Sequence, residues 1–580
     1  MKNSFFIRHL ILVLIASLPF SVSANNNIGP ISSTAAEEIF REVNSPDKPA
    51  VAVVVLHKNK VIYEKAFGSA NLEHKIPATV DTKFQVDTLA WEFIASAILM
   101  LEDQEKIKLT DDIRKYLPEI PDFGEKITIN HLLSSTDGLH GYKVLKSLAG
   151  WQAGEPEQHK AILQLITRQK KLNFKPGEAF SPGGDTRLIL LAKIVEVVSG
   201  QPFDAYCKSS IFTPLGMSNT LFVYDDAQPL NNTAVPYRND GKGAYKNDFV
   251  SGKAPGPTNL YTSIRDLSIW RASLDSHVLS TKSLAARLDT PIRLDHGEII
   301  KDISSISIYG QQHAGKERGI SKIYQIGSSG GYASSIFRFP DQEITAIVLS
   351  SGLAYNGSFG MRLASTILEN YFTEPATIDY DKIESVKLSA KQLQKYEGSY
   401  WSAARALPTK IEVKNGVLHY IRASGAGERA LIPLGNSTFQ MKIEGDDKYI
   451  VKFLKKKDGH TMHFMMADSD PIVFESYKEA AYTKNDLAQF AGTFHSEELN
   501  SSFTFKVENG ILAANNVRTG TINLKPITSD IFFGNKSFMG GIKFSRGGNN
   551  EVNGFQVVVD EVRNLEFKKI RLDEAPKGRL

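Results

Sequence analysis

Residues 90–101 are apolar on nearly every side of a predicted helix, and this is the strongest constraint on what the chain can fold into. A helix at the surface of a domain shows a single apolar stripe, so a helix that is apolar all round must cross an interior. Predicted strands lie at 51–55 and 61–63 before it, and at 335–339 and 344–349 long after it. Strands at both ends and helices between them predict an α/β domain with two lobes.

The first 24 residues have the pattern of a secretory signal peptide. Lys2 and Arg8 provide a basic start, residues 10–20 are apolar, and residues 22–24 are small enough for cleavage. The apolar run is too short to span a bilayer, and no later stretch is long and apolar enough to do so. We therefore expect a bacterial protein that is periplasmic or secreted, with no stable membrane span after cleavage; an uncleaved anchor is the alternative.

Charge and cysteine content exclude several classes of protein. The 580 residues carry 68 Lys and Arg against 64 Asp and Glu, a net charge of +4, and loss of Lys2 and Arg8 with the signal peptide lowers it to +2. This balance argues against nucleic acid as a partner and makes no case for binding to a membrane surface. Because Cys207 is the only cysteine, no disulfide can form within the chain, and ordinary hydrophobic cores must stabilise several domains.

A repeat in the last third of the chain predicts two copies of one small β domain. The segment 396–400 resembles 490–494, and Asn415-Gly416 matches Asn509-Gly510, both at an offset of 94 residues. Asn-Gly is a preferred pair for a tight hairpin turn, and short strands with turn signals surround both copies. The predicted domain limits are a first domain at 25–375, a linker at 376–387, and antiparallel β-barrels at 388–480 and 483–573.

Several short motifs are spread over residues 35–375. They are 63–68 (Tyr-Glu-Lys-Ala-Phe-Gly), 127–133 (Ile-Thr-Ile-Asn-His-Leu-Leu), 138–139 (Gly-Leu), 176–180 (Pro-Gly-Glu-Ala-Phe), 214–220 (Pro-Leu-Gly-Met-Ser-Asn-Thr), 260–267 (Leu-Tyr-Thr-Ser-Ile-Arg-Asp-Leu) and 338–341 (Arg-Phe-Pro-Asp). These motifs resemble the landmarks of one superfamily, that of the serine β-lactamases and penicillin-binding proteins, in its branch of class C β-lactamases, esterases and D-aminopeptidases. The resemblance implies a two-lobed domain made of an antiparallel sheet and a helical lobe. The two repeats resemble the lipocalin-like barrels of secreted D-aminopeptidases.

In that superfamily, a serine at the start of the buried helix attacks an acyl group, and a lysine one helical turn later takes its proton. The frame at 80–101 places Thr88 at the serine position and Trp91 at the lysine position. Thr88 keeps a hydroxyl but adds a methyl group that crowds attack, and the indole N–H of Trp91 donates without accepting a proton. Trp91 either stacks on a sugar or aryl ligand or fills the volume of the lost catalytic groups; we favour the second.

The resemblance also implies a tyrosine and an asparagine after residues 176–181, and a histidine or lysine on a late strand. These positions fall on Pro182, Gly184 and Gln325. Pro182 and Gly184 have no side chain that moves a proton, and Gln325 hydrogen-bonds without titrating. Gly327 and the edge of its strand are retained, so we expect a groove that can pair with an extended peptide.

Five changed positions are better explained by lost catalysis than by one variant mechanism. We therefore predict that no catalytic residue is intact, and that the cleft is lined by Thr88, Trp91, Gln325 and Gly327. The leading hypothesis is an exported, catalytically inactive homologue that binds a peptide, a muropeptide or a protein partner. No motif calls for a cofactor or a metal, and none is expected.

Two alternatives stay open. In the first, the chain is a divergent hydrolase of the D-aminopeptidase, esterase or β-lactamase type that uses Thr88. Adjacent residues at a helix start point apart, which weakens Asp87 as its base. In the second, the barrels bind the ligand and the first domain is a platform. The candidate bases of the first alternative are Asp87, Asp137, Asp185 and His140.

Other short matches lie outside the frame that the landmarks set, and we interpret them as structural because three-residue patterns recur by chance in a long chain. The histidine pair among them has no acid or cysteine beside it to complete a metal site. The matches are Ser45-x-x-Lys48, Tyr237-x-Asn239, His313-x-Gly315 and the pair His460/His463.

Overall fold

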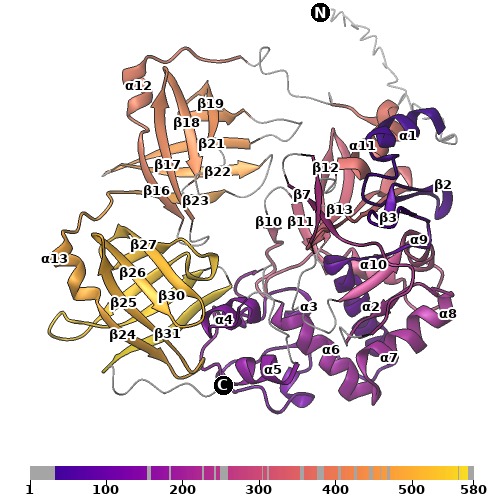
Figure 1. The fold of residues 1–580 in the computed structure, drawn as a ribbon, viewed down its shortest axis with the longest axis horizontal. Coiled ribbons are helices and arrows are strands. Elements are labelled where there is room, and N and C mark those ends of the chain that lie inside the picture. Colours follow the sequence, from indigo (N-terminus) through magenta and orange to yellow (C-terminus); the bar gives the residue numbers. More distant parts are fainter. Residues whose placement is uncertain are drawn as a thin grey trace, which may run out of the picture.

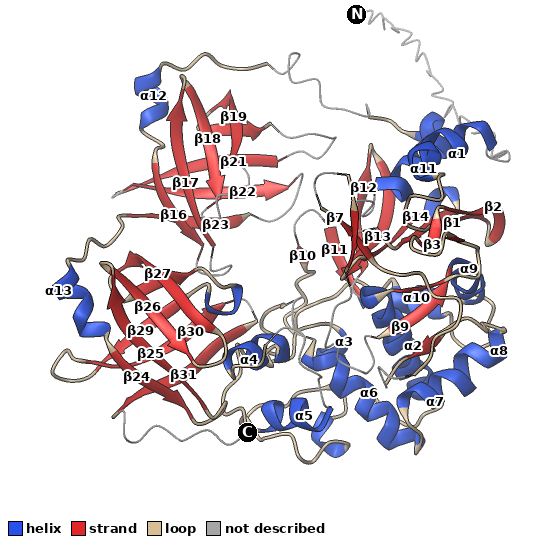
Figure 2. Ribbon diagram, in the orientation of Figure 1, coloured by secondary structure: helices blue, strands red, loops and turns tan. Residues whose placement is uncertain are grey.

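The fold consists of one large sheet with helices around it and two barrels, which the computed structural model places beside one another (Figure 1). Figure 2 shows the same view by secondary structure. None of the helices within the described ranges is long and apolar enough to cross a membrane. The structure describes residues 33–152, 159–181, 185–224, 228–240, 243–248, 259–302, 305–309, 312–352, 358–374, 384–402, 407–422, 428–442, 449–457, 459–466, 471–559 and 561–571.

An antiparallel sheet of eight strands, in the order β10-β11-β12-β13-β14-β15-β1-β2, forms the centre of the first domain within the described residues. Strand β1 pairs with β15 from Val51↔Ser350 to His57↔Ile344, so strands from both ends of the domain lie side by side. The bounds are β1 (Val51–His57), β2 (Lys60–Phe67), β10 (Lys301–Asp302), β11 (Ser305–Ile308), β12 (Gln312–Glu317), β13 (Ile320–Ser329), β14 (Tyr332–Phe339) and β15 (Ile344–Ser350).

Both faces of this sheet are buried, because successive side chains of a strand point to opposite faces. In β1, Val51, Val53 and Val55 belong to a core with α1 (Ser33–Phe40) and α11 (Ser358–Leu368). The alternate residues Ala52 and Val54 belong to the larger core of the helical lobe. A strand covered on both sides reads as a continuous apolar run, which is what residues 51–55 show.

Helix α2 (Ala90–Asp103) crosses the interior of the helical lobe, and every residue from Ala90 to Leu101 is buried, as its sequence predicts. The only acid in this stretch, Glu92, forms an ion pair with buried Arg271, which compensates a charge that would otherwise be costly to bury. The other helices of the lobe are α3 (Ile129–Leu133), α4 (Tyr142–Leu148), α5 (His159–Thr167), α6 (Thr186–Ser199), α7 (Phe203–Cys207), α8 (Thr213–Leu215), α9 (Ile264–Ser273) and α10 (Leu284–Leu288).

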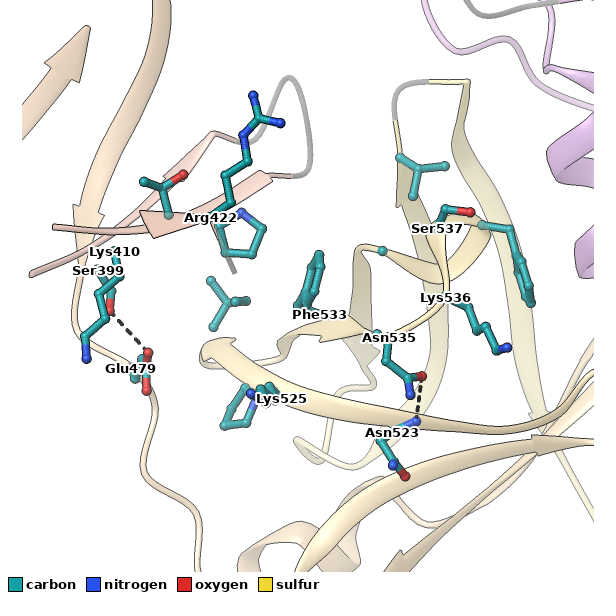
Figure 3. A pocket seen from close by; sticks show the side chains of 18 of the residues that line it. Ser399, Lys410, Arg422, Glu479, Asn523, Lys525, Phe533, Asn535, Lys536 and Ser537 are labelled. Atoms are coloured by element: carbon teal, nitrogen blue, oxygen red, sulfur yellow. Dashed lines mark hydrogen bonds between the residues drawn. The ribbon is translucent and has the colours of Figure 1, made fainter. Parts of the chain in front are cut away.

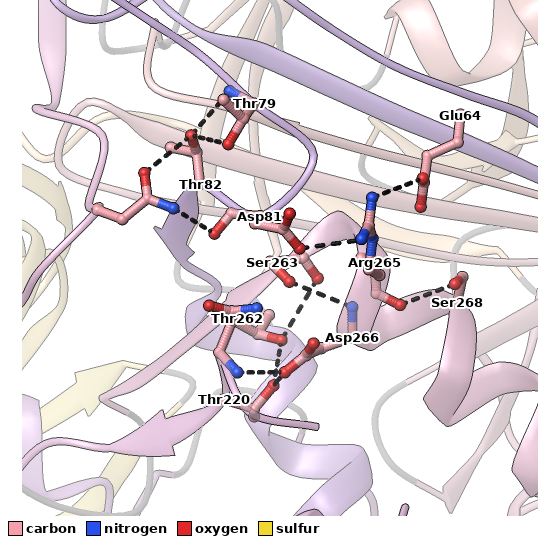
Figure 4. Close-up of polar contacts among 12 residues, drawn as sticks. Glu64, Thr79, Asp81, Thr82, Thr220, Thr262, Ser263, Arg265, Asp266 and Ser268 are labelled. Carbon is pink, nitrogen blue, oxygen red and sulfur yellow. Dashed lines mark hydrogen bonds and ion pairs between the residues drawn. The ribbon is translucent and has the colours of Figure 1, made fainter. Parts of the chain in front are cut away.

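A polar network holds the loop before β6 against the start of α9 (Figure 4). The Asp266 carboxylate accepts hydrogen bonds from the Asn219 N–H at 2.8 Å and the Thr220 hydroxyl at 2.7 Å. Ser263 caps α9 by accepting from the Asp266 N–H at 3.2 Å. Two landmark motifs, 214–220 and 260–267, therefore stabilise the fold. The small strands nearby are β3 (Ser69–Asn71), β4 (Ile76–Pro77), β5 (Lys83–Gln85), β6 (Leu221–Phe222), β7 (Tyr237–Asn239), β8 (Tyr245–Asn247) and β9 (Leu260–Ser263).

The C-terminal region forms two closed antiparallel barrels of eight strands each, which confirms the predicted architecture. Short helices α12 (Ala390–Gln394) and α13 (Lys484–Leu487) precede them. The strands are β16 (Gly398–Ser402), β17 (Leu407–Lys414), β18 (Val417–Arg422), β19 (Glu428–Gly435), β20 (Thr438–Met441), β21 (Tyr449–Lys456), β22 (Gly459–Met466) and β23 (Ile472–Tyr477), then β24 (Gly492–Ser496), β25 (Ser501–Glu508), β26 (Ile511–Asn516), β27 (Gly520–Thr528), β28 (Ile531–Gly534), β29 (Ile542–Arg546), β30 (Val552–Val559) and β31 (Val562–Ile570).

The repeated Asn-Gly pairs are tight hairpin turns, as predicted. Asn415 and Gly416 have φ of 52° and 78°, and Asn509 and Gly510 have φ of 51° and 78°. Two-residue turns of the favoured hairpin type need positive φ at both central positions, which asparagine and glycine tolerate best. Each pair therefore fixes the register of the two strands that it joins.

The second barrel shares its hydrophobic core with the helical lobe. Leu145 and Leu148 of α4 and Leu165 of α5 belong to the same buried cluster as the phenylalanines of this barrel. Figure 1 shows α4 and α5 beside β30 and β31. The first barrel has a separate core of its own. The second barrel is therefore packed against the first domain as an integral part of the fold.

Candidate functional site

Thr88 lies where β5, α2 and β13 meet. It belongs to a short 3₁₀ helix (Asp87–Leu89) that leads into α2, and its hydroxyl oxygen is shielded from solvent without a hydrogen-bond partner in the described part of the chain. Gly327 of β13 lies directly against it, because a Cβ atom at residue 327 would come within 2.0 Å of Thr88 Oγ1. Only glycine fits there without a shift of Thr88.

Gln325 holds the start of α2 in place. Its side chain is 2% exposed, and its Nε2 donates a hydrogen bond to the Thr88 backbone oxygen at 2.9 Å. The residue that we place at the third motif position therefore joins β13 to the turn before α2.

In the described part of the chain, one edge of β13 close to Thr88 has no paired strand. Within the described residues, the pairing of β13 with β12 ends at Tyr324, whereas residues 325–329 pair with β14. An edge of this kind can take up an extended peptide as an added strand.

Trp91 lies one helical turn after Thr88 and is covered by a buried guanidinium. Its side chain is 6% exposed, and the Arg187 guanidinium carbon lies 4.5 Å from the centre of its ring. A cation over the face of an indole is attracted by the electrons of the ring, most strongly where water is excluded. The site therefore holds a permanently charged group beside the tryptophan.

Three carboxylates compensate the charge of Arg187. Burial lowers the pKa of Arg187, while Asp137, Asp185 and Glu561 act to raise it. Burial raises the pKa of the Asp137 carboxyl, which Arg187 and a hydrogen bond from the Leu139 N–H at 2.8 Å oppose. Asp185 also forms an ion pair with Lys143. Glu561 comes from the second barrel, so the cluster joins two domains.

Three of the four candidate bases, His140, Asp137 and Asp185, contact other groups, and the side chain of the fourth, Asp87, is not described. His140 is buried, with Nδ1 at 2.7 Å from Gln169 Oε1 and Nε2 at 2.7 Å from the Arg563 backbone oxygen. Asp137 and Asp185 belong to the Arg187 cluster. Pro182, Gly184 and the side chain of Asp87 lie outside the described residues.

The short matches outside the frame have structural surroundings. Tyr237 donates to Glu73 at 2.5 Å and accepts from the Leu72 N–H at 2.8 Å. His313 lies 5.4 Å from the Tyr324 ring on neighbouring strands. His460 and His463 are in β22, and no group of three or more His, Cys, Asp or Glu that could hold a metal ion occurs within the described ranges.

Arg187 and Glu561 are the charged residues of this region that sequence reasoning missed. Arg187 is the only charged residue in the first turns of a largely apolar helix, 186–192, and every residue of that stretch is buried. A charge at such a position signals a buried ion pair. Glu561 carries no comparable signal, because its partner lies hundreds of residues away.

A family model described as Beta-lactamase matches residues 36–368. The chain belongs to this family. Among curated relatives, a putative penicillin-binding protein PbpX of Bacillus subtilis is 30% identical over 237 residues, covering 40% of this chain and 56% of its own length. A D-aminopeptidase of Gluconobacter oxydans is 25% identical over 258 residues, covering 43% and 47%. The chain thus spans about half the length of these relatives.

Solved structures show the same fold at low sequence identity. The octameric penicillin-binding protein homologue from Pyrococcus abyssi is 22% identical with a TM-score of 0.50, covering 76% of this chain and 98% of its own. The structure of SurE is 17% identical with a TM-score of 0.51, covering 77% and 98%. The family is therefore one of serine-hydrolase fold, with penicillin-binding and D-aminopeptidase relatives.

Proposed function

We propose that this chain is a catalytically inactive member of its family that binds a peptide, a muropeptide or a protein partner. The observation that carries the proposal is the buried Thr88 hydroxyl, which no group of the described residues contacts as a hydrogen-bond acceptor. A hydroxyl that attacks an acyl group gives its proton to a base within about 2.6–3.2 Å or one water away. Trp91 and Arg187 next to this site donate hydrogen bonds and cannot accept a proton.

Binding is supported by what lies beside Thr88. The edge of β13 beyond Tyr324 suits an extended peptide, and Gly327 lets this strand lie directly against Thr88. The relatives named penicillin-binding protein and D-aminopeptidase support a ligand of peptide chemistry.

The test of lost catalysis is intact-mass analysis of the protein after incubation with a fluorophosphonate and, separately, with a penicillin. We expect no adduct with either reagent. An adduct that maps to Thr88 and disappears in Thr88→Ala would favour the alternative, a divergent hydrolase that uses this threonine. Calorimetric titration of a muropeptide tests binding: we expect saturable heat, and a titration without heat would contradict a muropeptide as the ligand.

We also propose that residues 1–24 are a signal peptide and that the protein works outside the cytoplasm. The basic start, the apolar run and the small residues at 22–24 support this. Amino-terminal sequencing of the protein from a periplasmic fraction should begin at Asn25. Recovery of an intact Met1 from the membrane fraction would favour the uncleaved anchor.

A further inference from the structure

A cavity of about 1220 Å³ lies between the two barrels, among residues that none of the superfamily motifs includes (Figure 3). The first barrel lines it with parts of β16, β17 and β18, the second barrel with parts of β27 and β28 and the turn after β28, and α4 contributes Val144. Small-molecule sites usually measure about 300–1,000 Å³. This cavity therefore has room for several residues of an extended peptide.

The charges that line the cavity are predominantly positive. Lys410 forms an ion pair with Glu412, whereas Arg422, Lys525 and Lys536 are exposed and make no ion pair within the described ranges. The two acids on the lining have partners of their own. Glu479 accepts a hydrogen bond from the Ser399 hydroxyl at 3.2 Å, and Glu561 faces the Arg187 cluster. Three cations are thus left to attract a negatively charged ligand.

Each wall places an apolar side chain beside a cation. Lys410 is opposite Ile421 in the pairing of β17 with β18, and Lys525 is opposite Phe533 in the pairing of β27 with β28. Directly opposite residues of an antiparallel pair lie on the same face of the sheet. Figure 3 shows Phe533 between the two walls, and Ile511, which also lines the cavity, is 46% exposed. Covering this apolar surface would favour binding.

We propose that the cavity between the barrels binds an extended acidic peptide that carries apolar side chains. The cations stand on both walls, with Arg422 on the first barrel and Lys525 and Lys536 on the second, so they recognise negative charge at several points along a ligand. A fatty acid carries a single carboxylate and satisfies only one of them. Asn523 and Ser537 add polar side chains for a peptide backbone. The lining of this site does not include Thr88 or Trp91, and the proposal does not depend on the function of the Thr88 region.

The test uses the mature protein and a short fluorescein-labelled peptide that alternates glutamate with leucine, followed by fluorescence anisotropy. We expect saturable binding that weakens as salt is raised, since salt screens exposed charges. A peptide with glutamine in place of glutamate should bind at least about tenfold more weakly. Equal binding of the glutamine peptide, no binding of either peptide, or displacement of the acidic peptide by stoichiometric laurate would overturn the proposal.

Charge reversal at the cavity assigns the site. Arg422→Glu combined with Lys525→Glu should weaken binding by about a hundredfold, or about tenfold for each reversed charge. The matched control is Lys506→Glu with Lys543→Glu, two exposed lysines of the second barrel that do not line the cavity. It should keep the affinity within about twofold. An equal loss of affinity in both double variants, or no loss of affinity in either, would place the peptide at another site. Circular dichroism checks that all variants fold.

Discussion

Thr88 and Gly327 fit together so closely that a single methyl group on the strand disturbs the start of α2. We predict that Gly327→Ala lowers the free energy of unfolding by about 1–3 kcal/mol, the usual cost of an overpacked interior. The added Cβ would lie 2.0 Å from Thr88 Oγ1 and 3.1 Å from Thr88 Cβ. Urea unfolding followed by tryptophan fluorescence measures the change.

The double variant Gly327→Ala/Thr88→Ala separates this clash from a general effect of alanine. Removal of Oγ1 should restore part of the lost stability, since the two residues are in contact and their effects are not additive. Gly548→Ala is the control, because a Cβ there meets nothing within 4 Å. A loss of unfolding free energy in Gly548→Ala as large as in Gly327→Ala would contradict the prediction.

The Arg187 guanidinium holds together a cluster that would otherwise contain uncompensated buried carboxylates. Arg187→Leu should lower the free energy of unfolding by about 3–5 kcal/mol, because breaking a buried pair leaves a charge without its partner. Adding Asp137→Asn should recover part of the loss by removing one of those charges. Chemical denaturation measures both variants. A loss below about 1 kcal/mol for Arg187→Leu would mean that the cluster is open to water.

At the scale of elements, Asn173 of the helical lobe bonds to the backbone of the hairpin between β30 and β31. Asn173 Nδ2 donates to the backbone oxygens of Leu139 and Glu561, each at 3.0 Å, and its Oδ1 accepts from the Arg563 N–H at 2.5 Å. The Gly141 N–H adds a bond to the Glu561 oxygen at 2.8 Å. These bonds bring Glu561 close to Arg187.

We predict that Asn173→Ala loosens this hairpin and lowers the free energy of unfolding by about 1–3 kcal/mol, because buried backbone groups lose their partner. Hydrogen exchange read by mass spectrometry should show faster exchange at Arg563. Asn553→Ala is the control, an exposed asparagine of β30 whose side chain contacts Ser545. Unchanged exchange at Arg563 in Asn173→Ala would contradict the prediction and assign the hairpin's attachment to its other contacts.

For the whole molecule, His140 is buried between the helical lobe and the second barrel, and this burial makes the free energy of unfolding depend on pH. Burial lowers the pKa of His140 below its ordinary 6.5, against the hydrogen bonds with Gln169 and Arg563, which raise it. The unfolded chain therefore binds a proton at a higher pH than the folded chain, and acid favours unfolding. The contribution of His140 is complete above about pH 6.5 and is lost as the pH falls below that value toward the folded-state pKa.

Urea unfolding between about pH 8 and about pH 5 measures this dependence. The wild-type protein should lose up to about 1.4 kcal/mol more per pH unit than His140→Gln over the acidic part of the range. His296→Gln is the control, because His296 is exposed and contacts only Glu298 in the described residues. A His140→Gln variant with the wild-type pH dependence would contradict the assignment.

Much of the fold could be predicted from local patterns. Helix α2 was predicted from twelve residues that are apolar all round, β1 from an unbroken apolar run, and the barrel hairpins from Asn-Gly pairs. Such patterns work because they depend on neighbours within a few residues. The domain limits stay predictions. The roles of Thr88, Trp91, Gln325 and Gly327 also stay predictions, since the position of a residue in a motif does not test its chemistry.

Consecutive residues are enough to predict the family, the buried helix, the sheet strands at both ends of the domain and the repeated barrels, because each of these has a local signature. Three contacts follow from the packing of the domains instead: Arg187 covers Trp91, Gly327 lies against the Thr88 hydroxyl, and leucines of α4 enter the core of the second barrel. These contacts join residues about 100 to 400 positions apart. Burial and shape decide such contacts, and they exist only once the domains have packed.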